Sequence, residues 1–347
     1  MRNKRDEIKL LELLKIFSPG TAIRSALDDI LNAHMGALIV IDNGEVLEIC
    51  DGGFRINSKF SSQKLVELAK MDGAIILSDD LRQIIYANTL LSPDVKLSTK
   101  ETGTRHKAAE RTAKHTGAIV VAVSERKNKI TIYCRTIRYE LENSSEILRR
   151  ATETLQILEK QKETLNDLLI NLNVLEINNI VTISDVCLVL QRIEIIKRIS
   201  DMVKRYLIEL GKEGIIVSMR LKELTRNLIK ERNMILEDYF RATYSKIDFV
   251  LEEMSFDFLL EENNISKELF EDSHDREIFP RGIRILSKIG LRGEEIEILA
   301  NNFKDLTSMF SSDLDGFVKI FGDENIAKNV KNDLDDLRER IMSGKRV

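Results

Sequence analysis

The sequence predicts an α/β N-terminal domain, in which helices cover a mixed sheet, followed by an all-α spine and a small C-terminal α domain. Three observations support this order. Short apolar runs rich in β-branched residues alternate with amphipathic stretches before residue 143. Leucines then recur at a spacing of seven, and short helical patterns separated by glycines follow residue 280. We therefore expect three domains, at residues 1–143, 144–280 and 281–347.

The composition is typical of a charged, globular chain with long helices. A chain of 347 residues is too long for one compact core, and only 3 prolines interrupt it. The net charge of -4 gives no overall basic surface, so any binding of nucleic acid would need a local patch. No apolar segment has the length of a membrane span, which predicts a cytoplasmic protein with no membrane partner.

The cysteines indicate neither a disulfide framework nor a zinc site. They are odd in number, far apart and form no CxxC pair: Cys50, Cys134 and Cys187. We expect inert thiols in a reducing compartment.

In the N-terminal domain, the apolar periodicity gives the elements in chain order. Helices are expected at 3–16, after the break at 18–21 to about residue 35, at 61–71 behind a Ser61 or Ser62 cap, and at 104–116. Strands are expected at 37–41, 74–78, 83–88, 118–124 and 130–134. Hairpin-like pairs among these strands predict a mixed sheet and not a strict βαβ array.

A heptad seam opens the second domain. One series at a spacing of seven consists of Ala151, Leu158, Leu165 and Leu172, and a second, which Lys162 and Glu176 interrupt, of Leu148, Leu155 and Leu169. The seam predicts a long helix that packs against another helix or a second subunit. Further helices are expected to about residue 260, with a break at Gly211 and Gly214, and 261–280 is expected to be a linker. This helical bundle carries no evident chemistry.

Two stretches of the N-terminal domain carry side chains suited to nucleotides. Residues 103–107 (Gly-Thr-Arg-His-Lys) lead from a loop into a helix, whose first turn has free N–H groups and the positive end of the dipole. Cations at such a turn suit a phosphate. Asp72 and Gly73, at a helix-to-strand junction, supply a carboxylate for a hard cation or for a hydroxyl proton.

Each stretch taken alone has an ordinary interpretation. Asp-Gly is common in turns, and a run of basic residues is usually an exposed helix face. Neither GxxxxGK[ST] nor GxGxxG occurs, so an ordinary P-loop ATPase is not expected.

Together the two stretches resemble the DGA and RHR motifs of the diadenylate cyclase family. The resemblance is carried by residues 18–21, 70–75 and 102–106, and it covers about the first 140 residues. Along the helical middle, the chain also resembles those members of the family that scan DNA. It implies that Asp72 coordinates a divalent metal, Mg²⁺ or Mn²⁺, and helps to activate the ribose 3′-hydroxyl. It also implies that Gly73 lets the nucleotide approach the backbone closely.

The resemblance also implies which residues contact ATP. Thr104 and Arg105 would bind the triphosphate, and His106 would lie near the metal and the phosphates. Leu91 and Ser124 match the walls of the adenine pocket, although a core role suits Leu91 equally.

Two positions depart from the family pattern. Lys107 replaces an arginine and keeps the charge without the planar fork. Ala108 stands where a threonine is often found and lacks its hydroxyl donor. We expect these ATP-binding positions to hold phosphate modestly less well than the family pattern would.

The implied reaction condenses two ATP molecules into cyclic di-AMP and releases two pyrophosphates. Each 3′-oxygen attacks the α-phosphorus of the other ATP, so two domains must face each other. Asp72, Arg105 and His106 are the implied catalytic residues. The resemblance further implies a homo-octamer joined through the spine, and the heptad seam independently favours packing through helices.

The C-terminal domain matches only part of the family's helix-hairpin-helix, which presents backbone amides to a DNA phosphate. Ile320 occupies the first glycine position of the hairpin, and only Gly322 remains. Nearby acidic residues repel phosphate, while Lys328 and Lys331 partly offset them. Binding of branched DNA through Gly322, Lys328 and Lys331 therefore stays an open alternative.

Two other functions remain open beside the enzyme. One is a DNA-structure-sensing binding protein with a vestigial nucleotide site, and the other is a scaffold built on the spine. The intact Asp72–Gly73 turn favours the enzyme, and the incomplete hairpin counts against the sensor. A scaffold would keep its function after Asp72→Asn.

Overall fold

The computed structural model describes residues 4–240, 243–261, 264–270 and 276–345. They form two compact units, the first made of Met1–Thr152 with Lys204–Ser218 and the second of Glu153–Val203 with Met219–Val347. The first contains a mixed sheet with helices, and the described elements of the second are helices, which confirms the predicted fold class. The domain boundaries drawn from the sequence stay a prediction.

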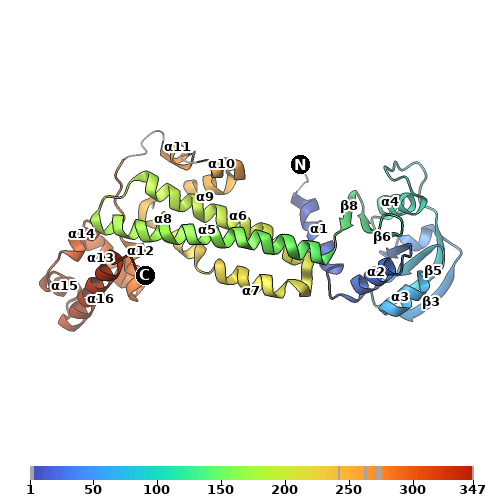
Figure 1. The fold of residues 1–347 in the computed structure, drawn as a ribbon, viewed down its shortest axis with the longest axis horizontal. Coiled ribbons are helices and arrows are strands. Elements are labelled where there is room, and N and C mark those ends of the chain that lie inside the picture. The colour runs from blue at the N-terminus through green and yellow to red at the C-terminus, as the bar shows by residue number, and fades with distance from the viewer. Residues whose placement is uncertain (1–3, 241–242, 262–263, 271–275, 346–347) are drawn as a thin grey trace. The chain divides into compact units, whose positions relative to one another are not determined.

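Among the described residues of the first unit, eight strands form one sheet (Figure 1). Its order is β2-β5-β4-β1-β6-β7-β8, and β3 also pairs with β5. β1 and β4 are parallel, and the other pairs are antiparallel. The strands are β1 Ala37–Ile41, β2 Cys50–Asp51, β3 Phe54–Lys59, β4 Ala74–Leu77, β5 Gln83–Leu91, β6 Ile119–Ser124, β7 Lys129–Cys134 and β8 Ile137–Leu141.

The five predicted strands are confirmed, with one extension and three omissions. β5 continues three residues past the predicted end, to Leu91. The sequence did not predict β2, β3 or β8, because none of the three has the fully buried apolar pattern of the central strands.

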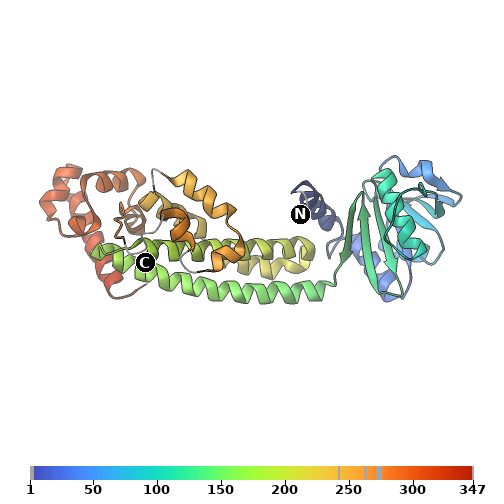
Figure 2. The same cartoon turned by 90° about the horizontal axis from the view of Figure 1, so that it is seen from above.

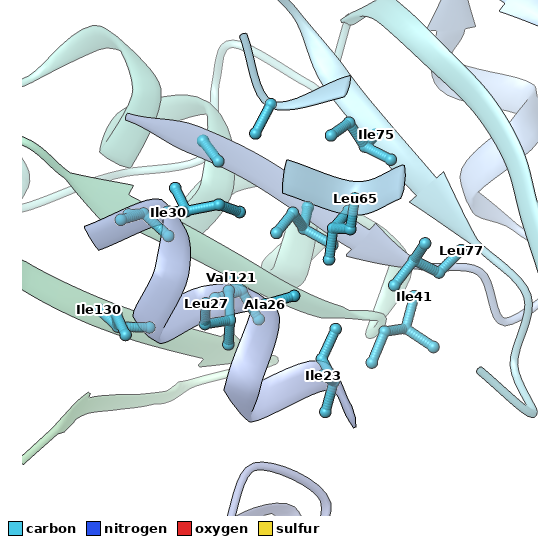
Figure 3. Close-up of a cluster of buried hydrophobic side chains, with 14 of the residues drawn as sticks. Ile23, Ala26, Leu27, Ile30, Ile41, Leu65, Ile75, Leu77, Val121 and Ile130 are labelled. Atoms are coloured by element: carbon cyan, nitrogen blue, oxygen red, sulfur yellow. The ribbon is translucent and has the colours of Figure 1, made fainter. Parts of the chain in front are cut away.

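Helices cover both faces of the sheet. One core joins the helices α2 (Ala22–Asn32) and α3 (Ser62–Leu68) to the sheet through Leu27, Leu65 and Ile41, which Figure 3 shows pointing toward one another. The opposite core packs α4 (Thr104–Thr116) on the sheet through Ala109 and Val40. Because strands in this position are buried on both faces, their sequences are continuous apolar runs, as at 37–41 and 118–124. The remaining helices of this region are α1 (Lys4–Ile16) and the 3₁₀ turn η1 (Val46–Ile49).

Helix bounds follow the predictions most closely where a cap is encoded locally. α4 spans the predicted 104–116, and Gly117 ends it in the left-handed conformation at φ 69°. Ser61 caps α3 by accepting a hydrogen bond from the Lys64 N–H, but α3 ends three residues before the predicted Met71.

The long helices carry the predicted seam. α5 (Ser144–Asn178) buries Ala151, Leu158, Leu165 and Leu172 almost completely, whereas Leu148 of the interrupted series is 36% exposed. α6 (Ile183–Leu210) is bonded to α5 by Arg192, which donates to Gln161. The seam therefore packs within one chain.

The remaining spine is more divided than predicted. The chain tightens into the 3₁₀ turn η2 (Gly211–Gly214) at the predicted break. The helix expected from there to residue 260 is four helices: α7 (Ile215–Leu224), α8 (Leu228–Phe240), α9 (Tyr244–Glu253) and α10 (Phe256–Leu260). The predicted linker at 261–280 contains α11 (Asn264–Phe270), and its residues 271–275 lie outside the described part. That prediction was therefore wrong over α11, whose 7 residues are too few to show a helical periodicity.

Most of the C-terminal helices are short, as predicted, and glycines stand at 282, 290, 293 and 322 between some of them. They are α12 (Ile283–Leu286), the 3₁₀ turn η3 (Ser287–Ile289), α13 (Gly293–Asn302), α14 (Leu306–Phe310), α15 (Leu314–Phe321) and α16 (Glu324–Met342). Their core includes Phe317 and Leu334 and also Ile177 from the end of α5. Figure 2 shows these orange and red helices beside the green end of α5. The second unit therefore shares one core between spine and C-terminal helices.

The described helices include none that is long and apolar enough to cross a membrane. The three cysteines are free thiols, with Cys187 buried and the other two half-buried.

Candidate active site

Sheet register brings the sequence-distant candidate residues to one edge. Leu38 pairs with Ala74 of β4, and Ala37 pairs with Val123 of β6. Gly36 directly precedes β1, Asp72 lies two residues before β4, and Ser124 ends β6. Because β1 and β4 are parallel and β6 is antiparallel to β1, the three residues lie in a row along one edge of the sheet.

Leu91 extends the same row. Leu91 ends β5, which is antiparallel to β4, so it lies at the same edge of the sheet. Leu91 is 8% exposed and packs in the core on the α4 side. Ser124 is half-buried, and its Oγ accepts a hydrogen bond from the Lys127 N–H.

α4 directs its N-terminus to this row. Only Gly117 and Ala118 separate the end of α4 from β6, which runs back along the helix to Ser124. The Arg105 guanidinium lies directly on Gly36, where a Cβ would come within 2.0 Å of Nη1. The Arg105 guanidinium thus occupies the space that a side chain at position 36 would take, at the same edge of the sheet as Asp72.

The first turn of α4 offers N–H donors. Gly103 is the N-cap residue, and it provides no side-chain hydrogen bond. The helical bonds begin with the Lys107 N–H, which donates to the Gly103 carbonyl at 2.9 Å. Among the described residues, no acceptor meets the N–H groups of Thr104 and Arg105. These donors and the helix dipole together favour an anion.

Lys107 and Ala108 lie in the same turn and are half-buried, while Thr104 is exposed. Within the described part of the chain, the Lys107 ammonium has no ion-pair partner. The turn therefore carries two permanent cations, Arg105 and Lys107, and no carboxylate of the described residues pairs with either.

His106 is held by a chain of side chains that the sequence did not reveal. Its Nδ1 lies 2.9 Å from the Tyr133 hydroxyl, which donates to Glu101 Oε1 at 2.8 Å. Arg138 donates its Nε–H to the same carboxylate oxygen at 2.6 Å. Because the Tyr133 hydrogen points to Glu101, the Tyr133 oxygen accepts the Nδ1–H of His106.

This chain fixes the tautomer of His106. With the proton on Nδ1, Nε2 keeps its lone pair, and that atom is buried without a partner among the described residues. Burial lowers the pKa of His106, and the cations Lys127, Arg138 and Arg105 lower it further, while Glu101 opposes them. The imidazole is therefore neutral near pH 7 and offers an acceptor at Nε2.

Glu101 and Tyr133 are kept in complementary protonation states, with Glu101 ionised and Tyr133 protonated. Burial alone would raise the pKa of Glu101. Hydrogen bonds from Arg138 and Tyr133 outweigh burial and lower this pKa, so Glu101 stays a carboxylate. Burial and Glu101 raise the pKa of Tyr133, so the phenol keeps its proton. The residues missed by sequence reasoning are thus Gly36, Glu101, Tyr133 and Arg138, and no local spacing signals their contacts.

The loop before α4 is tied along the helix. Glu110 accepts from the Thr99 hydroxyl at 2.5 Å and from the Lys100 N–H at 3.2 Å. Lys114 donates to the Ser98 carbonyl at 2.7 Å, and Arg111 to the Leu97 carbonyl at 3.0 Å. These bonds hold the loop that carries Glu101 and so support the His106 chain.

Gly73 has a different role from the one expected. Its φ is +86°, and a Cβ there would lie 2.8 Å from the carbonyl carbon of Asn88 and 3.0 Å from the Thr89 nitrogen. The space that a Cβ of residue 73 would take is therefore filled by the backbone of β5, while Gly73 itself is exposed on its other side. Glycine is needed because β4 and β5 approach each other here while Asp72 turns outward.

Asp72 is suited to be the protein ligand of a divalent cation whose other ligands come from the substrate and water. Its side chain is exposed, and it has no hydrogen-bond partner among the described residues. In the described part of the chain, no three His, Cys, Asp or Glu side chains gather as a metal-binding group. Mg²⁺ characteristically takes one or two carboxylates and completes its shell with water and substrate phosphates.

The C-terminal hairpin offers little to a DNA phosphate. Gly322 adopts φ +70° between α15 and α16, but the next residue, Asp323, accepts the N–H groups of Asn325 and Ile326 at 2.7 and 3.1 Å. These are the amides that a phosphate would use. Lys331 is bonded to the Phe310 carbonyl and to Asp335, and Lys328 is exposed.

Comparison with known proteins identifies related sequences over the whole chain. Residues 24–137 match the family model described as DisA bacterial checkpoint controller nucleotide-binding, and residues 141–275 match the model described as DisA bacterial checkpoint controller linker region. The DNA integrity scanning protein DisA of Clostridium acetobutylicum is 43% identical, covering 100% of this chain and 99% of that protein. The same-named proteins of Clostridium kluyveri and Clostridioides difficile are 42% and 40% identical, over 97% and 100% of both chains.

Proposed function

This chain belongs to the family of the DNA integrity scanning protein DisA, whose nucleotide-binding domain is that of a diadenylate cyclase, and we propose that it condenses two ATP molecules into cyclic di-AMP and two pyrophosphates. One observation supports this above the others. Asp72, Gly36 with Arg105, and Ser124 share one sheet edge with the free N–H groups at the start of α4. A carboxylate and an anion cradle at one edge suit transfer of a nucleotidyl group.

Asp72 is the residue that would hold Mg²⁺ or Mn²⁺, and the ion would lower the pKa of the ribose 3′-hydroxyl and offset phosphate charge. Thr104 and Arg105 would bind the triphosphate through their N–H groups and the guanidinium. Lys107 would add a point charge without bidentate contact. Leu91 and Ser124 would border the base, since the row places them on either side of Asp72 and Gly36.

His106 would take the proton of the 3′-hydroxyl. Its neutral imidazole presents a lone pair at Nε2, which cannot donate to phosphate but can accept from a hydroxyl. The 3′-oxygen would then bond to the α-phosphorus of the second ATP as the bond to pyrophosphate breaks. Glu101 and Tyr133 would stabilise the imidazolium that forms.

The reaction needs two copies of the domain, because each 3′-oxygen attacks an ATP held elsewhere. We infer a face-to-face pair of domains and propose the homo-octamer that the family resemblance implies. Light scattering on the purified chain tests this, and a monomer that forms cyclic di-AMP would contradict it.

Incubation with ATP and Mg²⁺ or Mn²⁺, read by mass spectrometry for cyclic di-AMP, tests the enzyme. Asp72→Asn should abolish the product, while the matched Asp29→Asn, an exposed acid on α2 on the opposite side of the sheet, should leave it unchanged. No product from a folded oligomer with either metal would overturn the proposal.

Regulation by branched DNA is a second proposal that rests on the name of the relatives. If residues 281–347 bind DNA, exposed Lys328 is the best placed of the candidate residues, and Lys328→Gln should weaken binding and reduce its salt dependence. Asp323→Ala should strengthen binding, because it frees two N–H groups. Unchanged binding in both variants would place any DNA contact elsewhere.

A further inference from the structure

The first unit contains a cavity of about 560 Å³ at the end of the sheet opposite the candidate active site. It lies under one face of α1, where β1 and β7 end and where β6 and β8 begin. Since β1 starts next to Gly36 and ends at Ile41, which lines the cavity, the five residues of this strand separate the two sites. The volume is in the usual range for a small-molecule site.

The floor of the cavity is a row of side chains from four neighbouring strands. Ile41 pairs with Ile119, and Ile119 pairs with Cys134. Cys134 pairs in turn with Ile137. Directly paired residues point to the same face of a sheet, and Ile41 and Ile119 place this face on the side of α2 and α3. Neighbouring strands lie about 5 Å apart, so the row is about 15 Å long and suits an extended apolar chain.

One stripe of α1 forms the opposite wall. The residues of α1 that line the cavity follow Lys9 at spacings of three, four and seven, so they share one face of the helix: Lys9, Glu12, Leu13 and Ile16. Leu13 and Ile16 add to the apolar surface, whereas Lys9 is half-buried and Glu12 is exposed. The cavity therefore has two apolar walls with charged groups at its rim.

Two cations gather at one end of the row. Burial raises the pKa of the Cys134 thiol, and the charges of Arg135 and Lys9 oppose that rise, so both cations lie near Cys134. Within the described part of the chain, neither Lys9 nor Arg135 has a hydrogen-bond or ion-pair partner for its side chain. Asp79 follows β4, at the other end of the row, and Glu12 is exposed on α1. The β7 end of the cavity is therefore the end that favours an anion.

We propose that this cavity binds a medium-chain carboxylate, with its apolar chain along the four-residue row and its carboxylate beside Lys9 and Arg135. Burial of the chain against Leu13, Ile16 and Ile119 supplies the affinity, because it removes apolar surface from water. The two cations fix the direction of the chain through charge-assisted hydrogen bonds. None of the residues proposed for the nucleotide site lines this cavity, so the proposal does not depend on the cyclase.

Isothermal titration calorimetry of the full chain tests the site with hexanoate, octanoate and decanoate as probes, each below its micelle concentration. Each added methylene should tighten binding about fourfold, because its burial is the main source of affinity. Octylammonium and 1-octanol share the octanoate chain without its negative charge, and both should bind about fivefold more weakly or worse. An affinity that does not change with chain length, or octylammonium bound as tightly as octanoate, would overturn the proposal.

Two substitutions separate the charge of the ligand from its chain. Arg135→Gln should weaken octanoate binding about fivefold and leave 1-octanol binding within about twofold, because only the carboxylate meets the guanidinium. Ile137→Phe should weaken the binding of both probes, because the larger ring takes up space on the floor of the cavity. Unchanged octanoate binding in either variant would contradict the assignment.

The controls use the same unit and the same readout. Arg55→Gln should bind octanoate like the wild type, because Arg55 is an exposed arginine of the first unit that does not line the cavity. Asp72→Asn should also bind octanoate like the wild type, which keeps the result distinct from any loss of cyclase activity. An exposed arginine rarely decides folding, so Arg135→Gln remains informative if Ile137→Phe is unstable. Equal weakening of octanoate binding in Arg135→Gln and Arg55→Gln would mean that the anion is bound elsewhere.

Discussion

Replacing Arg284 with methionine should destabilise the second unit by about 3–5 kcal/mol, the cost of breaking a buried ion pair from one side. The Arg284 side chain is 0% exposed, as is that of Glu176, and Glu231 is 13% exposed. Arg284 Nη2 lies 2.6 Å from Glu176, and Nη1 lies 3.0 Å from Glu231. Methionine fills much of the arginine volume, so the loss is electrostatic and not a cavity effect.

The magnitude follows from the two carboxylates left behind. Opposite charges 4 Å apart attract by about 4 kcal/mol at an effective dielectric constant of 20. After the substitution, the one donor that Glu176 keeps among the described residues is the hydroxyl of Tyr239, at 2.7 Å. A buried carboxylate with one neutral donor is poorly compensated, which supports the upper part of the range.

Urea unfolding followed by far-ultraviolet circular dichroism measures the effect, since the chain has no tryptophan and the second unit is helical. Arg220→Met is the matched control. Arg220 also pairs with two carboxylates, Glu159 at 2.7 Å and Glu223 at 2.9 Å, but it is 48% exposed. Exposed pairs contribute about 0–1 kcal/mol. Equal losses in Arg284→Met and Arg220→Met would refute the reasoning.

The pH dependence gives the same prediction a second test. Burial, together with Glu176, raises the pKa of Asp238 to about 7, and Arg284 opposes this shift. A raised acid pKa gives stability that is present below the unfolded pKa and is lost as pH rises through the folded value. At pH 5 Asp238 is protonated with or without Arg284, whereas at pH 8 only the wild type has the cation beside the carboxylate. The loss should therefore be larger at pH 8 than at pH 5.

Three further predictions concern the nucleotide domain. Gly73→Ala should lower the unfolding midpoint and nucleotide binding, because a Cβ would lie 2.8 Å from the β5 backbone at a φ of +86°. Lys107→Arg should raise ATP affinity several-fold by restoring bidentate contact, measured by calorimetry. Glu101→Gln should lower kcat more than it changes KM, and should move the acidic limb of the pH–rate profile to lower pH, because Glu101 raises the pKa of His106.

Each of these has a control in the chain. Gly44 has φ +95° and open space around its Cβ position, so Gly44→Ala carries the backbone strain without the collision. If Gly44→Ala costs as much as Gly73→Ala, the collision is not the cause. Glu140→Gln removes the other carboxylate on Arg138, 2.7 Å away, without contact to Tyr133, and should leave the pH–rate profile in place. An unchanged affinity in Lys107→Arg would mean that residue 107 does not bind phosphate.

Elements encoded by neighbouring residues could be predicted from the sequence. The β1 run has five consecutive buried residues, and the basic helix ends at a glycine in the left-handed conformation, so both bounds follow from local pattern. β8 and α11 could not be predicted this way. β8 is stabilised by pairing with β7, and α11 is only 7 residues long, so neither carries a periodicity of its own.

The residues of the candidate site also divide into those that the local sequence indicates and those that it does not. Asp72 and Arg105 could be selected because a turn carboxylate and a basic helix start have meaning by themselves. Tyr133 and Glu101 could not, because their importance comes from a hydrogen bond across 32 residues of chain. Gly36 is similar, since its contact with the Arg105 side chain arises from the fold and not from neighbouring residues in the sequence.

Gly73 shows why a motif can be recognised correctly and its physics still be misassigned. The Asp-Gly pair was expected to need glycine for close approach of a nucleotide, yet the space beside it holds the backbone of β5. The glycine instead lets two strands come together so that the preceding Asp72 turns out at the sheet edge. Function therefore depends on Gly73 through the position of Asp72, and a substitution at Gly73 should reduce catalysis only as far as it displaces that carboxylate.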